Sequence, residues 1–320
     1  MYRNIFVPFD GSAVSAAALP TAAALAVRSS ATLHLAFVHD PSAYIPFTAA
    51  KTGFPAFDPE AITADRRRDQ ATLDEAVGVL SRQGVNVRCT LLEGTIIETL
   101  IAHASGSGAD LIVMSTHGRS GFERLRVGSV ASVLVTRATQ PLLLVRADAH
   151  ETAASGTAAT GTEDGKAAGR RAILSGPLLV PLDGSEFAEQ ILPHAQQLAE
   201  AAETRLALTA VSVPHDLSMA PFGAAMLLAD ENDIAGEESA REGYLERVAK
   251  SLPADTTVNA VTDMAVANGI LDEAARIGAG GIALATHGRG GFKRMMLGSV
   301  ADELLRASRL PLLVYRPGTK

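Results

Sequence analysis

A stretch of 17 residues occurs twice in this chain and constrains its fold more than any other feature. The segments 115–131, STHGRSGFERLRVGSVA, and 285–301, ATHGRGGFKRMMLGSVA, are identical at 11 of 17 positions. Two further motifs repeat at a similar distance: VPFDGS at 7–12 returns as VPLDGS at 180–185, and PLLLVR at 141–146 is echoed by PLLVYR at 311–316. A repeat period of about half the 320 residues indicates two whole domains and not a solenoid.

Composition supports two domains of ordinary size. A chain of 320 residues with 47% hydrophobic content can bury two cores. Residues 148–175 are rich in Ala, Thr, Gly and Ser, and they bury too little apolar surface to offset the entropy of ordering them. We therefore predict a first domain over residues 1–147, a flexible linker over 148–175 and a second domain over 176–320.

Each copy alternates short apolar runs with longer amphipathic segments. In the first copy we expect strands at 5–9, 33–38, 85–92, 111–114 and 142–145, and helices at 12–29, 59–83, 95–106 and 129–137. In the second copy we expect strands near 178–182, 206–211, 257–261, 282–285 and 312–314. This alternation predicts an α/β fold of two tandem doubly wound parallel-sheet domains. Pro20 and Pro193 lie inside the first helix of each copy, and we expect both to kink it.

Charge and hydropathy exclude several classes of partner. The net charge of −7 argues against a nucleic-acid surface, which needs a clustered basic face. The chain contains no apolar run approaching the ~20 residues of a membrane helix, so we expect no membrane partner. The single cysteine, Cys89, cannot form an intrachain disulfide and suits a reducing compartment, and we expect a cytoplasmic protein.

The repeated residues fall where a doubly wound sheet binds ligands, beyond the carboxyl ends of its strands. Asp10 and Asp183 follow the first strands, and the glycine loops follow the fourth. Gly128-Ser129 and Gly298-Ser299 open the next helices with free N–H groups at the positive end of the helix dipole. This arrangement favours an anion, and a phosphate chain would fit it.

Structural explanations exist for the same residues. The glycines could form a tight turn and a helix start without a ligand, and an aspartate before Gly-Ser is an ordinary turn former. His117 and His287 could contact a ligand, make structural hydrogen bonds or act in catalysis. A turn can also be retained in both copies by common descent alone.

On these residues the chain resembles the universal stress proteins in their tandem form. The resemblance rests on IFVPFDGS at 5–12, the THGR loop at 116–119 and GSVA at 128–131, and it covers both copies. The family's ATP-binding branch carries Gly, two residues, Gly, nine residues, Gly and then Ser or Thr. Its last two glycines and Ser fall on Gly118, Gly128 and Ser129 and on their second-copy counterparts, whereas its first glycine falls on Ser115 and Ala285.

The resemblance implies a Rossmann-like fold of the adenine nucleotide alpha hydrolase type that binds ATP, with or without Mg²⁺. It places Asp10 and Asp183 by the ribose and phosphates, the backbone of Val38 and Val211 by the adenine, and the GSVA segments by the phosphates. The expected first-copy residues are Pro8, Asp10, Val38, Met114, Ser115, His117, Gly118, Arg119, Gly128, Ser129, Val130 and Ala131. The expected second-copy residues are Pro181, Asp183, Val211, Leu284, Ala285, His287, Gly288, Arg289, Gly298, Ser299, Val300 and Ala301.

The resemblance further implies a nucleotide-dependent regulator of the stress response with a protein partner still to be identified. Pairing of the last strands, 142–145 and 312–315, would make a pseudo-dimer within one chain, with a homodimer left open. Two alternatives remain: a protein-interaction module that has lost nucleotide binding, and an adenylyl- or phosphoryl-transfer enzyme. The chain contains no P-loop, no Gly-x-Ser-x-Gly elbow and no Cys/His zinc cluster, so we expect at most slow ATP hydrolysis and no dedicated catalytic residue or metal site.

Overall fold

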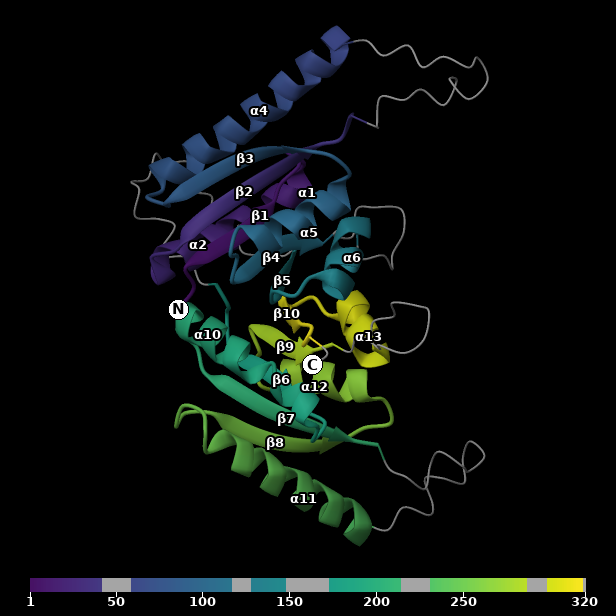
Figure 1. Cartoon of the computed structure of the whole chain (residues 1–320). Helices are drawn as coiled ribbons and strands as arrows, with labels where there is room; N and C mark the ends of the chain where they lie inside the picture. Colours follow the sequence, from purple (N-terminus) through teal and green to yellow (C-terminus); the bar gives the residue numbers. More distant parts are fainter. Residues whose placement is uncertain (42–58, 117–127, 148–172, 214–230, 287–297, 319–320) are drawn as a thin grey trace, which may run out of the picture. The chain divides into compact units, whose positions relative to one another are not determined.

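The structure, a computed structural model, describes residues 1–41, 59–116, 128–147, 173–213, 231–286 and 298–318 (Figure 1). The chain divides into two compact units, Tyr2–Ile173 and Leu174–Lys320, and each is described by itself. Residues 148–172 of the predicted linker lie outside the described residues, and Ile173 and Leu174 at its end are buried. No helix in the described ranges has the length and apolar character needed to cross a bilayer.

The first unit is a parallel sheet in the order β3-β2-β1-β4-β5. Its elements are β1 (Asn4–Pro8), α1 (Ala13–Ala16), α2 (Leu19–Ser29), β2 (Thr32–His39), α4 (Pro59–Arg82), β3 (Val87–Glu93), α5 (Ile96–Gly106), β4 (Leu111–Thr116), α6 (Ser129–Arg137) and β5 (Leu142–Arg146). Right-handed crossovers place α2 and α4 on one face of this sheet and α5 and α6 on the other.

The second unit has the same topology, with strand order β10-β9-β6-β7-β8. Its elements are β6 (Leu178–Pro181), α9 (Glu186–Glu189), α10 (Leu192–Ala202), β7 (Leu206–Ser212), α11 (Glu231–Ala249), β8 (Thr257–Thr262), α12 (Val266–Arg276), β9 (Gly281–Ala285), α13 (Ser299–Ala307) and β10 (Leu312–Tyr315). Figure 1 shows the long helices α4 and α11 beside β3 and β8, respectively. The predicted α/β class and the doubly wound parallel sheets are confirmed.

The central strands form the core of each unit because helices cover both faces of the sheet. Ile5, Phe6 and Val7 of β1 and Leu111, Ile112 and Val113 of β4 are 0% exposed. In the second unit, Leu179, Val180, Ile282 and Ala283 are likewise 0% exposed. Burial on both faces explains why these strands are continuous apolar runs. Each large side chain buried in this way contributes about 1.5–3 kcal/mol.

The predicted kinks at Pro20 and Pro193 are wrong in detail, because the chain breaks the helix before each proline. Helix α1 ends at Ala16, and α2 begins at Leu19 with Pro20 in its first turn. The second unit repeats the break, with Pro193 in the first turn of α10. In a first turn the N–H that proline lacks has no partner within the helix, so the residue costs nothing there.

Candidate functional site

The strand order places the switch point of the first unit between β1 and β4. The chain runs from β1 to β2 and β3 in one direction, and from β4 to β5 in the other. Doubly wound sheets bind their ligands outside the carboxyl ends of the strands at this point, which here are β1 and β4. The equivalent point of the second unit lies between β6 and β9. The predicted site residues within the strands lie at these points: Pro8, Met114 and Ser115 in the first unit, and Pro181, Leu284 and Ala285 in the second.

The loop after β1 folds around the exposed carboxylate of Asp10. Asp10 Oδ1 accepts a hydrogen bond from the backbone N–H of Ser12 at 2.9 Å, and the N–H of Asp10 donates to Ser15 Oγ at 3.3 Å. Partial burial raises the pKa of Asp10, but the hydrogen bonds from Ser12 and Ser15 outweigh it and hold the pKa below the ordinary 3.8. Asp10 is therefore ionised at neutral pH and can accept hydrogen bonds from ligand hydroxyls.

Ser115 joins the end of β4 to the same loop. Its hydroxyl donates to the backbone carbonyl of Val14 in α1, and the side chain is buried. The first turn of α1 is capped in turn by Ser12 Oγ, which accepts from the N–H of Ser15 at 3.0 Å. The structure thus brings Asp10 and Ser115 to one place, although they lie far apart in the sequence. Where the family motif has glycine, this chain uses a hydroxyl that glycine could not supply.

Helix α6 begins at the same edge of the sheet, and its N-cap residue has no side chain that could cap it. Its N-cap is Gly128, Ser129 is exposed at its first position, and Ala131 is buried one turn in. Helix α13 begins in the same way, with Gly298 as N-cap and exposed Ser299. Among the described residues no side chain accepts from the first N–H groups of either helix. These groups, including those of Val130 and Val300, can therefore bind an anion with the help of the helix dipole.

The second unit repeats the aspartate turn with different details. Asp183 Oδ1 accepts from both the N–H of Ser185, at 2.9 Å, and its hydroxyl, at 2.6 Å. Ser185 Oγ caps α9 by accepting from the N–H of Ala188 at 3.1 Å. Ala285 has no hydroxyl with which to make the bond that Ser115 makes. The two sites therefore share the carboxylate and the uncapped helix start, but they differ at the end of the fourth strand.

The end of β2 holds a hydrogen-bonded pair that the sequence did not reveal. His39 Nδ1 lies 2.7 Å from Asp69 Oδ2 of α4, and His39 is 3% exposed. The pair fixes the strand end beside Val38, where the adenine is expected. Asp69 is 30 residues away on a long polar helix, so the only sequence signal was a histidine at the end of an apolar strand. Val211 lies at the equivalent place in β7, and the strand ends one residue later at the buried Ser212.

Six predicted site residues lie outside the described residues. They are His117, Gly118, Arg119, His287, Gly288 and Arg289. The described parts of both sites are the aspartate turns, the ends of the second and fourth strands and the helix starts.

A sequence model of the universal stress protein family matches residues 1–146 and 176–316. The chain belongs to this family. The match comprises two segments, so this universal stress protein carries two family domains in tandem.

Relatives of this chain match it over its full length or over about one domain. A universal stress protein of Mycolicibacterium smegmatis is 26% identical over 319 residues, which cover 98% of this chain and 97% of the relative. One of Methanocaldococcus jannaschii is 30% identical over 148 residues, 46% of this chain and 83% of the relative. Among solved structures, a universal stress protein from Archaeoglobus fulgidus aligns with a TM-score of 0.63 at 15% identity, covering 98% of each chain. The last similarity shows the fold alone.

Proposed function

We propose that this universal stress protein binds an adenine nucleotide, ATP with or without Mg²⁺, in each copy. We further propose that nucleotide occupancy controls its interaction with a protein partner during the stress response. The first-copy site comprises Asp10, Val38 and the start of α6, and the second comprises Asp183, Val211 and the start of α13.

One observation carries the proposal: each switch point combines an aspartate carboxylate with a helix start that no described side chain caps. A nucleotide needs acceptors for its ribose hydroxyls and donors for its anionic phosphates. Asp10 supplies the first kind of group, and the N–H groups of Ser129, Val130 and Ala131 supply the second. The caps of α1 and α9 make the contrast clear, because those helices satisfy their first N–H groups with serine hydroxyls.

The described residues suit phosphate binding better than an independent metal site. They contain no cluster of three or more His, Cys, Asp or Glu side chains that could hold a metal ion. Mg²⁺ is commonly bound by one or two carboxylates together with substrate phosphates. We therefore expect any Mg²⁺ to bind with the nucleotide, with Asp10 or Asp183 as the protein carboxylate.

Calorimetric titration with ATP and Mg²⁺ tests the proposal through Asp10→Asn and Asp183→Asn. Asparagine can still accept the hydrogen bond from the N–H two residues on, so the turn persists while the charge is removed. A hydrogen bond to a charged group contributes ~1.5–3 kcal/mol and one to a neutral group ~0.5–1.5 kcal/mol, so we expect about five- to tenfold weaker binding at the altered site.

Asp74→Asn is the matched control, because Asp74 is exposed on α4 and lies outside both predicted sites. It should bind ATP as the wild type does. If wild-type protein takes up no ATP, or if the variant with both Asp10→Asn and Asp183→Asn binds it unchanged, the proposal fails. The first result would favour the interaction module.

A further inference from the structure

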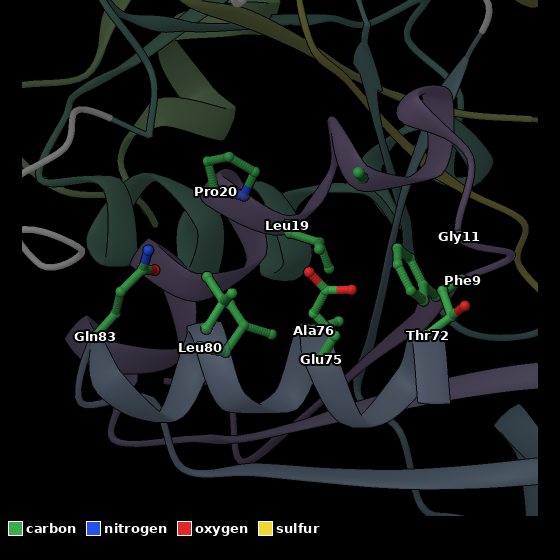
Figure 2. Close-up of a pocket in the computed structure, with 11 residues that line it drawn as sticks. Phe9, Gly11, Leu19, Pro20, Thr72, Glu75, Ala76, Leu80 and Gln83 are labelled. Carbon is green, nitrogen blue, oxygen red and sulfur yellow. The ribbon is translucent and has the colours of Figure 1, made fainter. Parts of the chain in front are cut away.

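A cavity of about 490 Å³ lies between α4 and the α1–α2 segment of the first unit (Figure 2). Its volume falls within the ~300–1,000 Å³ typical of small-molecule sites. Phe9 and Gly11 are at one end and Gln83 is at the other. None of the residues lining the cavity is among the predicted nucleotide contacts. The cavity therefore shares no lining residue with the predicted nucleotide sites, although Phe9 and Gly11 flank Asp10, and it lies on the face of the sheet that α2 and α4 cover.

Short side chains on facing helices leave this space open. Ala16 of α1 and Thr72 of α4 both line the cavity. In the second copy the residue 173 positions after Ala16 is Glu189. When the sequences of α4 and α11 are aligned on the fully buried leucines Leu73 and Leu245, Tyr244 corresponds to Thr72.

The second copy has larger side chains at both positions, and they are bonded to each other. Tyr244 OH donates to Glu189 Oε1 at 2.9 Å and so bridges α11 to α9. The pKa of Tyr244 lies far above its ordinary value, so the phenol stays protonated and can donate. Burial is the largest cause, and the hydrogen bond to Glu189 and the charges of Glu189 and Asp183 add to it. The first copy has a methyl group and a threonine at these two positions. The two copies therefore differ at two of the positions that line this cavity in the first copy.

The walls of the cavity are mainly apolar, and their polar side chains are Thr72, Gln83 and the carboxylate of Glu75. Leu19 and Pro20 line one side and Leu80 the other, with Val79, 41% exposed, also on the α4 side. Figure 2 shows the carboxylate of Glu75 rising from α4 into the space opposite Leu19. Glu75 forms no ion pair with any residue in the described part of the chain. An occupant would gain by covering the apolar wall and by placing a positive charge beside this carboxylate.

We propose that the cavity binds a small organic cation with an apolar body, such as a primary amine on an alkyl or aryl chain. The ammonium group pairs with Glu75, and the chain lies between Leu19 and Leu80. The proposal does not depend on nucleotide binding, because no residue of the cavity belongs to the proposed nucleotide sites.

The test compares two probes of nearly equal shape, 5-phenylpentylamine and 5-phenylpentan-1-ol, by ligand-observed NMR titration of the full-length protein. Both should bind, and the amine should bind about two- to fivefold more tightly, the range expected for one exposed ion pair. Glu75→Gln should remove this preference while leaving the affinity of the alcohol unchanged. Asp74→Asn, the neighbouring charge change, should leave the preference intact.

A second variant fills the cavity with the side chains that the second copy uses. The pair Ala16→Glu and Thr72→Tyr should form the bridge of Glu189 and Tyr244 and abolish binding of both probes. Circular dichroism confirms that this variant is folded, and Glu75→Gln tests the site independently if it is not. Three results would each overturn the proposal. They are failure of the wild-type protein to bind either probe, equal affinity of the wild-type protein for the amine and the alcohol, and undiminished binding by the filled variant.

Discussion

Replacing Gly298 with serine should separate the stability of the second copy from its proposed nucleotide binding. Gly298 is the N-cap of α13, with φ −59° and ψ 147°, a conformation open to any residue. A Cβ added there would meet no atom of the described residues within 4 Å. Serine therefore fits, and because it is a better N-cap than glycine it should stabilise the helix by a few tenths of a kcal/mol.

The same substitution should impair phosphate binding. The new hydroxyl would accept a hydrogen bond from the N–H of Val300 or Ala301, the donors assigned to the phosphates. Losing one hydrogen bond to a charged group costs ~1.5–3 kcal/mol, which corresponds to ~10- to 100-fold weaker ATP binding at this site. Thermal unfolding and calorimetric titration of one protein sample measure the two effects, and the unaltered first-copy site is the internal control.

Two results would refute this reasoning. Unchanged ATP affinity at the second site would mean that the first N–H groups of α13 do not contact the phosphates. A melting temperature lowered by several degrees would mean that the fold requires glycine at position 298. That result would support the explanation in which the glycines have a purely structural role.

Three further predictions concern stability. Ser115→Ala should cost about 1 kcal/mol in urea unfolding of the first unit through loss of the bond to the Val14 carbonyl, and an unchanged midpoint would count against that bond. Gly280→Ala should destabilise the second unit by ~1–3 kcal/mol or more, because the new Cβ would lie 2.5 Å from the backbone N of Gly176. The control is Gly236→Ala, where a Cβ meets nothing within 4 Å, and it should be neutral or stabilising. Acidification below about pH 6.5 should destabilise the first unit. Burial, with the charges of His103 and Arg88, lowers the pKa of His34 from 6.5, and burial also lowers the pKa of His103, so that only the unfolded chain takes up these protons. If the double variant His34→Gln, His103→Gln loses stability on acidification as steeply as the wild type, this explanation is wrong.

The sequence predicted the strands and the fold because their signals are local. Continuous apolar runs such as 5–7 and 111–113 are typical of strands buried on both faces, and all ten predicted strands are present. The helix break before Pro20 was missed because the alanine-rich run 16–18 favours helix on both sides of it. Propensity could not show that the break gives the proline a first-turn position.

Side-chain partners across the fold were harder to predict. The His39–Asp69 pair and the Ser115–Val14 bond join residues 30 and 101 positions apart. No periodicity marks such partners, because they depend on which helix covers which strand end. The cavity beside Glu75 was missed for the same reason: Ala16 and Thr72 become significant only once α1 is known to face α4.

The most direct test of nucleotide binding is to denature freshly purified protein and quantify the released small molecules per chain by mass spectrometry. We predict adenine nucleotide approaching two per chain, one for each pair of carboxylate and uncapped helix start. Absence of nucleotide, followed by no uptake of added ATP with Mg²⁺, would contradict the account and leave the glycine loops as inherited structure.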